Sequence, residues 1–370
     1  MKGYEMKKNI GLVFGGKSDE YEISLMSSAN VLRALDESKY DITKIGMTKD
    51  GRWFVTEATA DEIENGSWAE RSDNVKCSVP HDPTIGGILL FDANNVATVR
   101  RIDCLVPVLH GDHGEDGEIQ GLFQLAEIPY VGSGVKSSAN CMDKTAAKQL
   151  AKLTGVRMAD DYIVRIANFF NDRDGELRKI AERFGGKYPL FVKPSAAGSS
   201  VGVTKVRSAE ELETAIGEAL KYDHKALVEE AIVGREMEVA VLGNLEPVAS
   251  SVGEIRSAAE FYDYESKYIN PEIQTSIVED LSGEEIDSIR SYAVKLYKAL
   301  DCRGLARVDF FYADDERNGE RVVFNEINTF PGFTNISMYP MLWRHDGVDT
   351  PELMDRLIEL AFDEHRDWCR

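Results

Sequence analysis

Short runs of apolar residues alternate with amphipathic stretches over the first part of the chain. Residues 9–14, 41–47 and 103–109 have the length and composition of buried strands, and residues 23–35 and 118–126 carry apolar positions at helical spacing. The run 103–109 is nearly all apolar, which is typical of a parallel strand covered by helices on both faces. The pattern predicts an N-terminal domain of the α/β class with a parallel sheet, whose ligands approach the carboxyl ends of the strands.

The pattern changes after residue 140, where strands begin to follow strands. A helix is expected at 144–153, and the pairs Ser208–Glu211 and Ser282–Glu285 have the spacing of capping boxes that open two later helices. Strands are predicted at 189–193, 201–206, 226–230, 237–242, 305–312 and 321–327. The last two strands are joined by a polar loop and should pair antiparallel. We therefore expect α+β lobes after the first domain, with domains at 1–139, 140–230 and 231–370.

Size and charge narrow the class of protein. At 370 residues the chain is long enough for two or three domains, and its 43% hydrophobic and 29% charged residues are typical of a soluble globular protein. The formal net charge of −21 argues against a nucleic-acid partner, because such binding depends on clustered Lys and Arg. We find no secretory signal and no run long enough to span a membrane. The five cysteines are scattered without a CxxC pair, so free thiols in a reducing cytoplasm are expected.

Polar residues recur at every second position in the last two predicted strands. Arg307 and Asp309 share one face of the first strand, and Glu326 and Asn328 share one face of the second. If the strands pair, two carboxylates, an amide and a guanidinium meet, and oxygen ligands of this kind suit Mg²⁺. The alternative is a salt-bridge patch on a solvated sheet face. We favour the metal site, because an amide beside two acids and just before a tight turn has no evident role in such a patch.

Two glycine-containing segments are candidates for binding phosphate. Residues 11–18 match the P-loop pattern G-x-x-x-x-G-K-[ST], but residues 11–14 belong to the predicted strand and leave too few positions for a cradle. Residues 195–202, with the sequence SAAGSSVG, lie between two predicted strands, and small residues there let the backbone approach phosphate oxygens. Lys193 on the incoming strand can reach the same phosphates. We favour the second segment over a plain hairpin loop, because a nucleotide needs both donors and a cation.

A loop rich in histidine and acids, HGDHGEDG, follows the apolar strand at 110–117. Two histidines three positions apart could indicate zinc, but no second pair of ligands stands near them in the sequence. We expect instead that Asp116 caps the next helix and that His110 contacts a substrate carboxylate. Glu22 follows the glycines at the end of the neighbouring strand, where a carboxylate could bind a substrate ammonium group.

Several segments in a fixed order resemble the D-alanine:D-alanine ligases of the ATP-grasp superfamily. They are FGGKS with EISL, HGDHGEDGEIQGL, CMDK, VKPSAAGSSVGV, YDYESKY, GLARVDF and NEINTFPGFT. The match covers almost the whole chain, and the shared order makes it specific. The resemblance implies a two-lobed ATP-grasp fold after the N-terminal domain. It also implies an ADP-forming ligase that joins two D-alanine molecules through an acyl phosphate.

The resemblance assigns roles to single residues. For ATP it implies lysines on the phosphates, residues 229–232 around the adenine and an acid on the ribose, a set comprising Lys144, Lys193, Ser200, Glu229, Glu230, Ile232 and Glu236. It implies two Mg²⁺ ions, which Mn²⁺ can replace, on Asp309, Glu326 and Asn328. For the first D-alanine it implies Glu22 and His110, with Ser199 and Tyr268 completing a hydrogen-bonded triad with Glu22. For the second substrate it implies Lys267, Ser337 and Met338, and for the tetrahedral intermediate Arg307 with the Gly332 amide.

The family resemblance also implies a homodimer in the bacterial cytoplasm that supplies peptidoglycan precursors, and a lid at 262–269 that excludes water from the acyl phosphate. Relatives that use D-lactate or D-serine as acceptor are the main alternative. The D-lactate enzymes carry His at the position of Tyr268, and the resistance types often carry Arg at that of Met338, so both residues here favour D-alanine. A nucleotide-binding protein without turnover, or an enzyme acting on another carboxylate as biotin carboxylase does, would lack a reason for the His110 and Glu22 segments together with Arg307.

Overall fold

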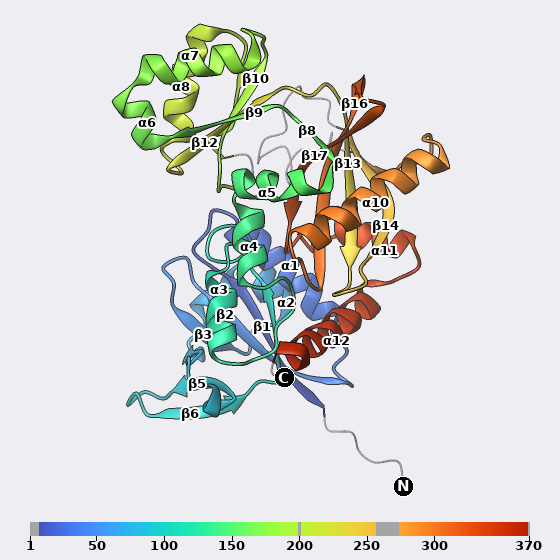
Figure 1. Ribbon diagram of the computed structural model, residues 1–370. Helices are drawn as coiled ribbons and strands as arrows, with labels where there is room; N and C mark the ends of the chain where they lie inside the picture. Colours follow the sequence, from blue (N-terminus) through green and yellow to red (C-terminus); the bar gives the residue numbers. More distant parts are fainter. Residues whose placement is uncertain (1–6, 199–200, 257–273, 369–370) are drawn as a thin grey trace.

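The computed structural model describes residues 7–198, 201–256 and 274–368, and these form three sheets (Figure 1). The first sheet has the strand order β6-β5-β4-β3-β2-β1-β7, the second β11-β10-β12-β9 and the third β15-β14-β13-β16-β17-β8. The first lies at the end of the molecule that holds the N-terminus, and the four-stranded second sheet lies at the opposite end in Figure 1.

The N-terminal sheet is parallel at one side and antiparallel at the other. The strands β1 (Lys8–Gly15), β2 (Tyr40–Met47) and β7 (Cys104–Val108) run parallel, as the apolar runs predicted. Antiparallel pairing then extends the sheet from β2 through β3 (Trp53–Thr56), β4 (Val75–Ser78), β5 (Gly87–Phe91) and β6 (Ala97–Arg101). A wholly parallel sheet was therefore the wrong prediction. The added strands are short and expose many side chains, so they lack the apolar runs that identify β1 and β7.

Helices from both ends of the chain cover this sheet. They include α1 (Tyr21–Ala34), α2 (Ala60–Glu64) and α3 (Glu118–Leu125), with 3-10 turns at Ser67–Glu70 and Pro83–Ile85. The last helix, α12 (Thr350–Trp368), returns to the N-terminal sheet, and its Leu353 and Leu357 share one buried core with Leu12 and Val106 (Figure 1). The C-terminal residues therefore pack with the first sheet, and the domain boundaries drawn from the sequence stay predictions.

The four-stranded sheet is antiparallel throughout. Its strands are β9 (Asp161–Arg165), β10 (Leu190–Pro194), β11 (Thr204–Val206) and β12 (Lys225–Glu230). Helices α6 (Ile166–Asn171), α7 (Arg173–Phe184) and α8 (Ala209–Ala219) contribute Phe169, Ile180 and Ile216 to its core. Because β10 and β11 pair, the two ends of the predicted glycine-serine loop come together.

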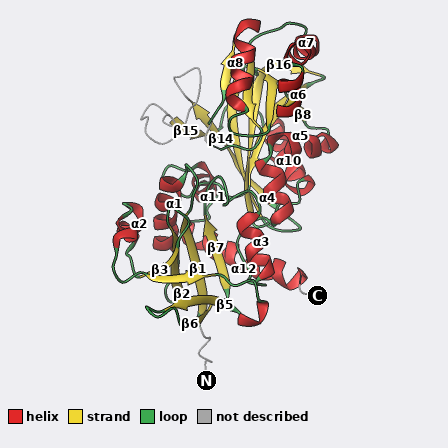
Figure 2. Ribbon diagram, turned by 90° about the vertical axis from the view of Figure 1, so that its left-hand side faces the viewer, coloured by secondary structure: helices red, strands yellow, loops and turns green. Residues whose placement is uncertain are grey.

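The six-stranded sheet carries the predicted antiparallel pair. Its strands are β13 (Gly234–Leu242), β14 (Val248–Arg256), β15 (Gln274–Ile277), β16 (Leu305–Arg317) and β17 (Glu320–Asn328), and β8 (Arg157–Met158) joins β17 in parallel. The helices around it are α4 (Val135–Met142), α5 (Lys144–Ala151), α10 (Gly283–Ala299) and α11 (Met338–His345). On one face Val308 and Phe310 pack with Ile289 and Leu296 of α10. Figure 2 shows this sheet extending from the N-terminal sheet toward the four-stranded one.

The predicted helix ends have mixed outcomes. The capping box of Ser282 and Glu285 is formed at the start of α10. At Ser208 the prediction was wrong, because the serine side chain caps nothing and the Glu211 carboxylate instead accepts the Arg207 N–H at 2.7 Å. The helix α5 ends through a 3-10 turn, Lys152–Thr154, at Gly155, whose φ of +74° favours glycine.

Two exclusions from the sequence can be compared with the described residues. In that part of the chain no helix combines the length and the apolarity needed to cross a membrane. Cys77, Cys104, Cys141 and Cys302 are free thiols in the interior, as the scattered cysteines predicted.

Candidate active site

Charged residues from three neighbouring strands stand in one row across the six-stranded sheet. The register places Glu238 of β13 opposite Asp309 of β16, and Asp309 opposite Glu326 of β17. In the next row Arg307 stands opposite Asn328. Directly opposed residues project from the same face of a sheet, so the structure brings together the four polar residues that the sequence had paired.

A β-bulge on β17 makes this row possible. Asp309 is opposite Glu326, whereas its neighbour Phe310 is opposite Phe324, so Asn325 is an extra residue in β17. Phe310 and Phe324 both lie in the core beneath α10, with ring centroids 6.3 Å apart. The bulge therefore keeps an aromatic pair on the buried face while the acid two residues later stays on the face of the charged row.

Arg307 is the centre of the row. Its Nε and a terminal nitrogen each donate to one oxygen of Asp309 at 2.8 Å, and its Nε lies 3.2 Å from Oε1 of Glu238. The side chains of Arg307, Asp309 and Glu238 are 15%, 11% and 7% exposed. One guanidinium thus offsets two carboxylates in a partly buried place, where charge interactions are stronger than in water.

The donors next to Arg307 fit a hard cation. Asp309 and Glu326 offer carboxylate oxygens, and Asn328 offers an amide oxygen, which accepts the Phe330 N–H at 3.2 Å and keeps a second lone pair. Lys144 approaches Glu326 at 3.5 Å and donates to the Ala197 carbonyl at 2.8 Å. Oxygen donors without nitrogen or sulfur suit Mg²⁺, and a lysine beside them suits a phosphate. This set can bind both a divalent cation and a polyphosphate.

A second cluster of charges lies at the end of β12. Oε1 of Glu229 contacts the ammonium group of Lys148, and Oε2 of the same carboxylate contacts that of Lys193. All three side chains are largely buried. Burial, with repulsion from Lys148 and Lys144, lowers the pKa of Lys193 to about 7, and burial lowers the pKa of Lys148 to about 8. The structure thus places Lys193 and Glu229, two predicted nucleotide residues, in direct contact.

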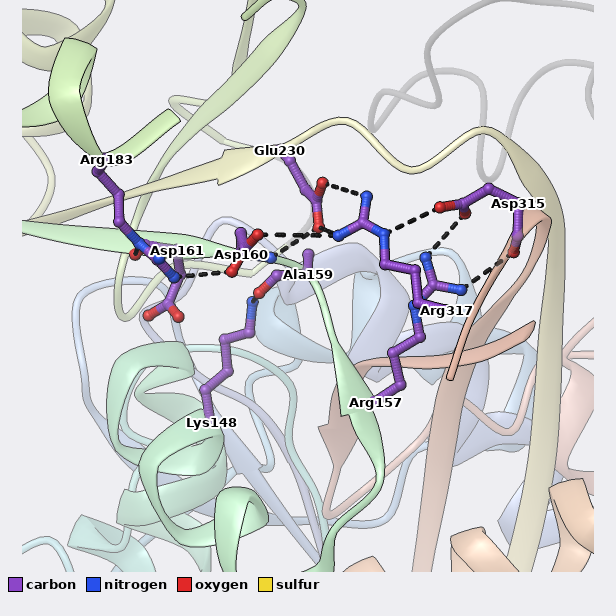
Figure 3. Close-up of polar contacts among 9 residues, drawn as sticks. All are labelled: Lys148, Arg157, Ala159, Asp160, Asp161, Arg183, Glu230, Asp315 and Arg317. Carbon is purple, nitrogen blue, oxygen red and sulfur yellow. Dashed lines mark hydrogen bonds and ion pairs between the residues drawn. The ribbon is translucent and has the colours of Figure 1, made fainter. Parts of the chain in front are cut away.

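Glu230 points away from this cluster into an ion-pair network (Figure 3). Two nitrogens of Arg317, near the tip of the β16–β17 hairpin, donate to its two carboxylate oxygens at 2.7 Å each. Its Oε1 also accepts the Asp160 N–H at 2.9 Å. Hydrogen bonding to Arg317 holds the pKa of Glu230 below its usual value, although burial opposes this. The network ties the four-stranded sheet to the six-stranded one beside the predicted adenine segment.

The two remaining described residues of the predicted nucleotide set lie on the path from β12 into β13. Ile232 is half-buried in the connection between the strands. Glu236 lies on β13 two positions before Glu238 and therefore on the same face as the charged row. Their contact with a nucleotide stays a prediction.

His110 is buried where three segments of the chain meet. Its Nε2 lies 3.2 Å from Oγ of Ser27 on α1, and that hydroxyl oxygen accepts the Phe333 N–H at 3.1 Å. Burial lowers the pKa of His110 to about 4, and the nearby charge of Arg307 acts in the same direction. The imidazole is therefore neutral at neutral pH, so it would meet a substrate carboxylate as a hydrogen-bond donor and not as a cation.

Glu22 lies in the first turn of α1, at the carboxyl end of β1 as the sequence predicted. Its side chain is 57% exposed, and Oε1 accepts from Lys49 at 2.5 Å. The structure therefore pairs Glu22 with Lys49, whereas His110 is paired with Ser27. A substrate ammonium group would have to replace Lys49 at this carboxylate.

Three further predicted residues follow β17. A Cβ on Gly332 would lie 2.9 Å from Oγ of Ser337, so only glycine fits there without displacement. The Ser337 hydroxyl accepts the Thr334 N–H at 3.0 Å. Met338 is 4% exposed, and its sulfur would lie 2.4 Å from a Cβ on Gly253, so Met338 packs in the core between α11 and β14. Its predicted role in acceptor choice is untested by this position.

Some predicted residues lie outside the described ranges. They are Ser199 and Ser200 of the glycine-serine loop, and Lys267 and Tyr268, which fall within the predicted lid at 262–269. Their roles stay predictions.

Two alternatives from the sequence can be settled. The strand β1 runs through Gly15, so residues 11–15 are extended and cannot form a P-loop cradle. His110 is buried beside Ser27, whereas the exposed His113 lies 2.5 Å from Glu118, so the two histidines do not form a zinc pair. Asp116 accepts the Glu118 N–H at 3.0 Å at the start of α3, as predicted.

The sequence analysis missed two residues of these clusters. Glu238 follows Glu236 at the spacing that places both on one face of a strand, which is the signal that identified the pairs on β16 and β17. Lys148 stands four residues after Lys144, so both lie on one side of α5. Neither spacing alone says that the side chain is buried, and burial is what marks them.

Two family descriptions match the chain over most of its length. The description "D-ala D-ala ligase N-terminus" matches residues 9–133, and "D-ala D-ala ligase C-terminus" matches residues 150–359. The chain belongs to the D-alanine–D-alanine ligase family. The ATP-grasp fold and the identification as a ligase, both expected from the sequence, are confirmed.

Named relatives of this ligase family are similar over nearly full length. The D-alanine–D-alanine ligase of Acetivibrio thermocellus is 46% identical, with 98% of this chain and 97% of the relative covered. That of Clostridium novyi is also 46% identical, with 96% and 98% covered. Among solved structures, VanG D-Ala:D-Ser ligase from Enterococcus faecalis is 38% identical with a TM-score of 0.85, over 96% of this chain and 100% of that one. The D-alanine–D-alanine ligase from Coxiella burnetii is 35% identical with a TM-score of 0.83, over 98% and 96%.

Proposed function

We propose that this chain joins two D-alanine molecules at the expense of ATP, and that the dipeptide serves as a peptidoglycan precursor. The observation that carries the proposal is the pairing of Arg307 with the row of Glu238, Asp309 and Glu326 in a chain of this family. Such a row provides what transfer of a phosphoryl group needs, which is positioning and compensation of charge.

The chemistry proceeds in two steps. The carboxylate of the first D-alanine attacks the γ-phosphorus of ATP, so an acyl phosphate forms and ADP leaves. The amine of the second D-alanine then attacks the acyl carbon, the peptide bond forms and inorganic phosphate leaves. A carboxylate is a poor acylating agent, and the first step converts it into a reactive one.

We assign the phosphates to Lys144 and Lys193, with Ser200 as a further donor. The contacts of Lys144 with Glu326 and with the Ala197 carbonyl support its assignment, because they place the ammonium group between the carboxylate row and the glycine-serine segment. Glu229, Glu230 and Ile232 surround the adenine, and Glu236 meets the ribose. The ion pair of Lys193 with Glu229 supports a site in which phosphate and base lie close to the same strand end.

Asp309, Glu326 and Asn328 would hold Mg²⁺, and we propose two ions that Mn²⁺ can replace. When bound, they would offset the charge on the transferring phosphate. The oxygen-only donor set supports this assignment.

The first D-alanine is assigned to Glu22 and His110, with Ser199 and Tyr268 as the partners of Glu22. The second D-alanine is assigned to Lys267, Ser337 and Met338. Arg307 and the Gly332 amide would donate to the oxyanion that forms at the acyl carbon. The buried position of Arg307 and the absence of space for a side chain at Gly332 support these two roles.

Release of phosphate from ATP tests this function. We expect release with D-alanine as the sole amino acid and Mg²⁺ present, and none with L-alanine. Mass spectrometry should find D-alanyl-D-alanine in amounts equal to the phosphate. Binding of ATP without release for any D-amino acid would support the alternative of a nucleotide-binding protein without turnover.

D-serine is the acceptor to test against D-alanine, because one similar structure is a D-Ala:D-Ser ligase. We propose D-alanine as the second substrate on the basis of Tyr268 and Met338. With equal D-alanine and D-serine at neutral pH, the homodipeptide should be the main product, and the same result is expected with D-lactate. A main product containing D-serine or D-lactate would contradict the assignment.

We further propose a homodimer located in the cytoplasm, with family resemblance as the support. Light scattering of the purified protein should give twice the mass of the chain. A monomer at micromolar concentration would contradict the dimer and leave the ligase activity unaffected.

A further inference from the structure

One buried carboxylate is shared by two buried lysines that come from different parts of the fold. Lys193 lies on β10, next to β12, so it reaches Glu229 within the four-stranded sheet. Lys148 reaches the same carboxylate from α5, whose Ala147 and Ala151 belong to the core of the six-stranded sheet. The two lysines occupy different oxygens of Glu229.

The two lysines differ in their freedom to move. The Lys148 side chain is 2% exposed, and its ammonium group also lies 3.4 Å from the Ala159 carbonyl, as Figure 3 shows. The Lys193 side chain is 13% exposed and lies on the strand that leads into the glycine-serine segment. Together the three ionised groups hold one surplus positive charge, which an incoming anion can neutralise.

We propose that Lys148 is a positioning residue that keeps Glu229 paired while Lys193 exchanges this carboxylate for the phosphates of ATP. Without nucleotide, Lys193 occupies Oε2 of Glu229. With nucleotide, Lys193 turns to the phosphates, Oε2 accepts the exocyclic amine of adenine, and Oε1 stays on Lys148. The inference rests on the proposed nucleotide site and adds a residue that acts on the base through Glu229.

The charge balance explains why Lys148 is needed. If Lys148 were uncharged, Lys193 could leave Glu229 only by exposing a buried carboxylate with no cation, which is a costly state. Lys193 would therefore stay on Glu229 and compete with both phosphate and adenine. The variant itself should fold, because Glu229 and Lys193 remain as a balanced pair.

Direct binding of nucleotides to Lys148→Met tests the inference. By calorimetry we expect the Kd for ATP to rise by roughly tenfold or more, since removing one partner of a buried charge pair commonly has effects of this size. The KM for D-alanine should stay within about twofold. Lys148→Arg should restore much of the ATP affinity, because it restores the cation. Lys152→Met is the matched control: Lys152 follows α5 directly, is 53% exposed and pairs with Asp161 at 3.6 Å.

Two further readings separate positioning from a general structural role. ITP carries a carbonyl where adenine has its amine, so the preference for ATP over ITP should fall in Lys148→Met, whereas structural damage would weaken both nucleotides alike. In a Glu229→Gln background, Lys148→Met should change the ATP Kd by less than about threefold, because its effect passes through Glu229. This pair also serves if the single variant does not fold, since neither charge is then left unpaired.

The outcomes are distinct. An ATP Kd and an ATP-to-ITP preference within twofold of wild type in Lys148→Met, or an independent loss in the Glu229→Gln background, would overturn the inference. If wild type still binds ATP and releases phosphate with D-alanine, the proposed function stands whatever the result for Lys148. Failure of wild type itself would overturn the function instead.

Discussion

The N-terminal sheet and the six-stranded sheet present their polar residues in opposite ways. In the N-terminal sheet the bodies of β1 and β7 are buried and apolar, and the candidate site residues Glu22 and His110 come after the strands end. In the six-stranded sheet the charges of Glu238 and Asp309 lie within the strands themselves. A parallel strand covered on both faces has no place for a charge along its length. An antiparallel strand with one open face can alternate core and site residues.

The difference teaches where side chains can be held firmly. A residue after a strand is positioned by the loop and by its neighbours, as the contact of His110 with Ser27 illustrates. A residue inside a strand inherits the register of the sheet, so the opposition of Asp309 and Glu326 follows from backbone pairing alone. We infer that the second arrangement carries the charge compensation of the reaction, and that the first mainly binds and orients the first substrate.

Arg307→Met should have the largest effect. Losing this donor should lower kcat by about 10²–10³, as loss of one donor to a developing oxyanion commonly does. Steady-state phosphate release with saturating ATP and D-alanine measures it. Arg321→Met is the control, because Arg321 lies on the neighbouring strand but is 45% exposed and only 3.9 Å from Glu316. A loss below tenfold for Arg307→Met would remove the catalytic role from the strand bodies.

His110→Gln should change how stability depends on pH. The folded-state pKa of about 4 is below the ordinary value, so the unfolded chain binds a proton at His110 that the folded chain does not bind between about pH 6.5 and 4. Stability from this group is therefore present above pH 6.5 and lost as pH falls to 4, by roughly 3 kcal/mol in total. Urea unfolding at pH 4.5 and 7 should show a smaller difference in His110→Gln than in wild type.

The exposed His113 offers the matched control. His113→Gln should keep the wild-type difference, because its side chain is 45% exposed at the surface. Equal pH dependence in wild type and His110→Gln would contradict burial of the group that follows β7.

Glu238→Gln should have a smaller effect on turnover. The amide keeps the shape of the side chain but loses the charge that faces Arg307 at 3.2 Å. A hydrogen bond between charged groups contributes about 1.5–3 kcal/mol, so kcat should fall by about tenfold or somewhat more if Glu238 holds Arg307 in place. Unchanged kcat in a folded variant would mean that Asp309 alone positions the guanidinium.

Arg317→Met should have the smallest effect. Its bidentate contact with Glu230 is 44% exposed on the arginine side, and exposed ion pairs contribute about 0–1 kcal/mol. We expect the KM for ATP to rise by about two- to threefold, with kcat unchanged. Arg183→Met, which removes a contact to Asp160 at 2.7 Å in the same network, is the comparison and should leave the KM for ATP unchanged. A tenfold rise for Arg317→Met would mean that the surface network controls the nucleotide site.

Much of the fold and of the site follows from the sequence. Period-two spacing predicted the row of Arg307, Asp309, Glu326 and Asn328, because register converts spacing into proximity. The antiparallel strands at 53–101 could not be predicted, since short exposed strands carry no apolar run. The ion pair of Glu229 with Lys148 joins positions 81 residues apart, so only the packing of α5 against the end of β12 shows it. The cap at Ser208 failed because Glu211 found a different backbone partner.

Isotope transfer from D-alanine tests most directly the claim that the chain activates a carboxylate as an acyl phosphate. With D-alanine labelled by ¹⁸O in its carboxylate, ATP and Mg²⁺, one labelled oxygen should pass into each phosphate released, because the attacking oxygen leaves with the phosphoryl group. The dipeptide should keep one labelled oxygen in its peptide carbonyl. Unlabelled phosphate released together with dipeptide would contradict the account.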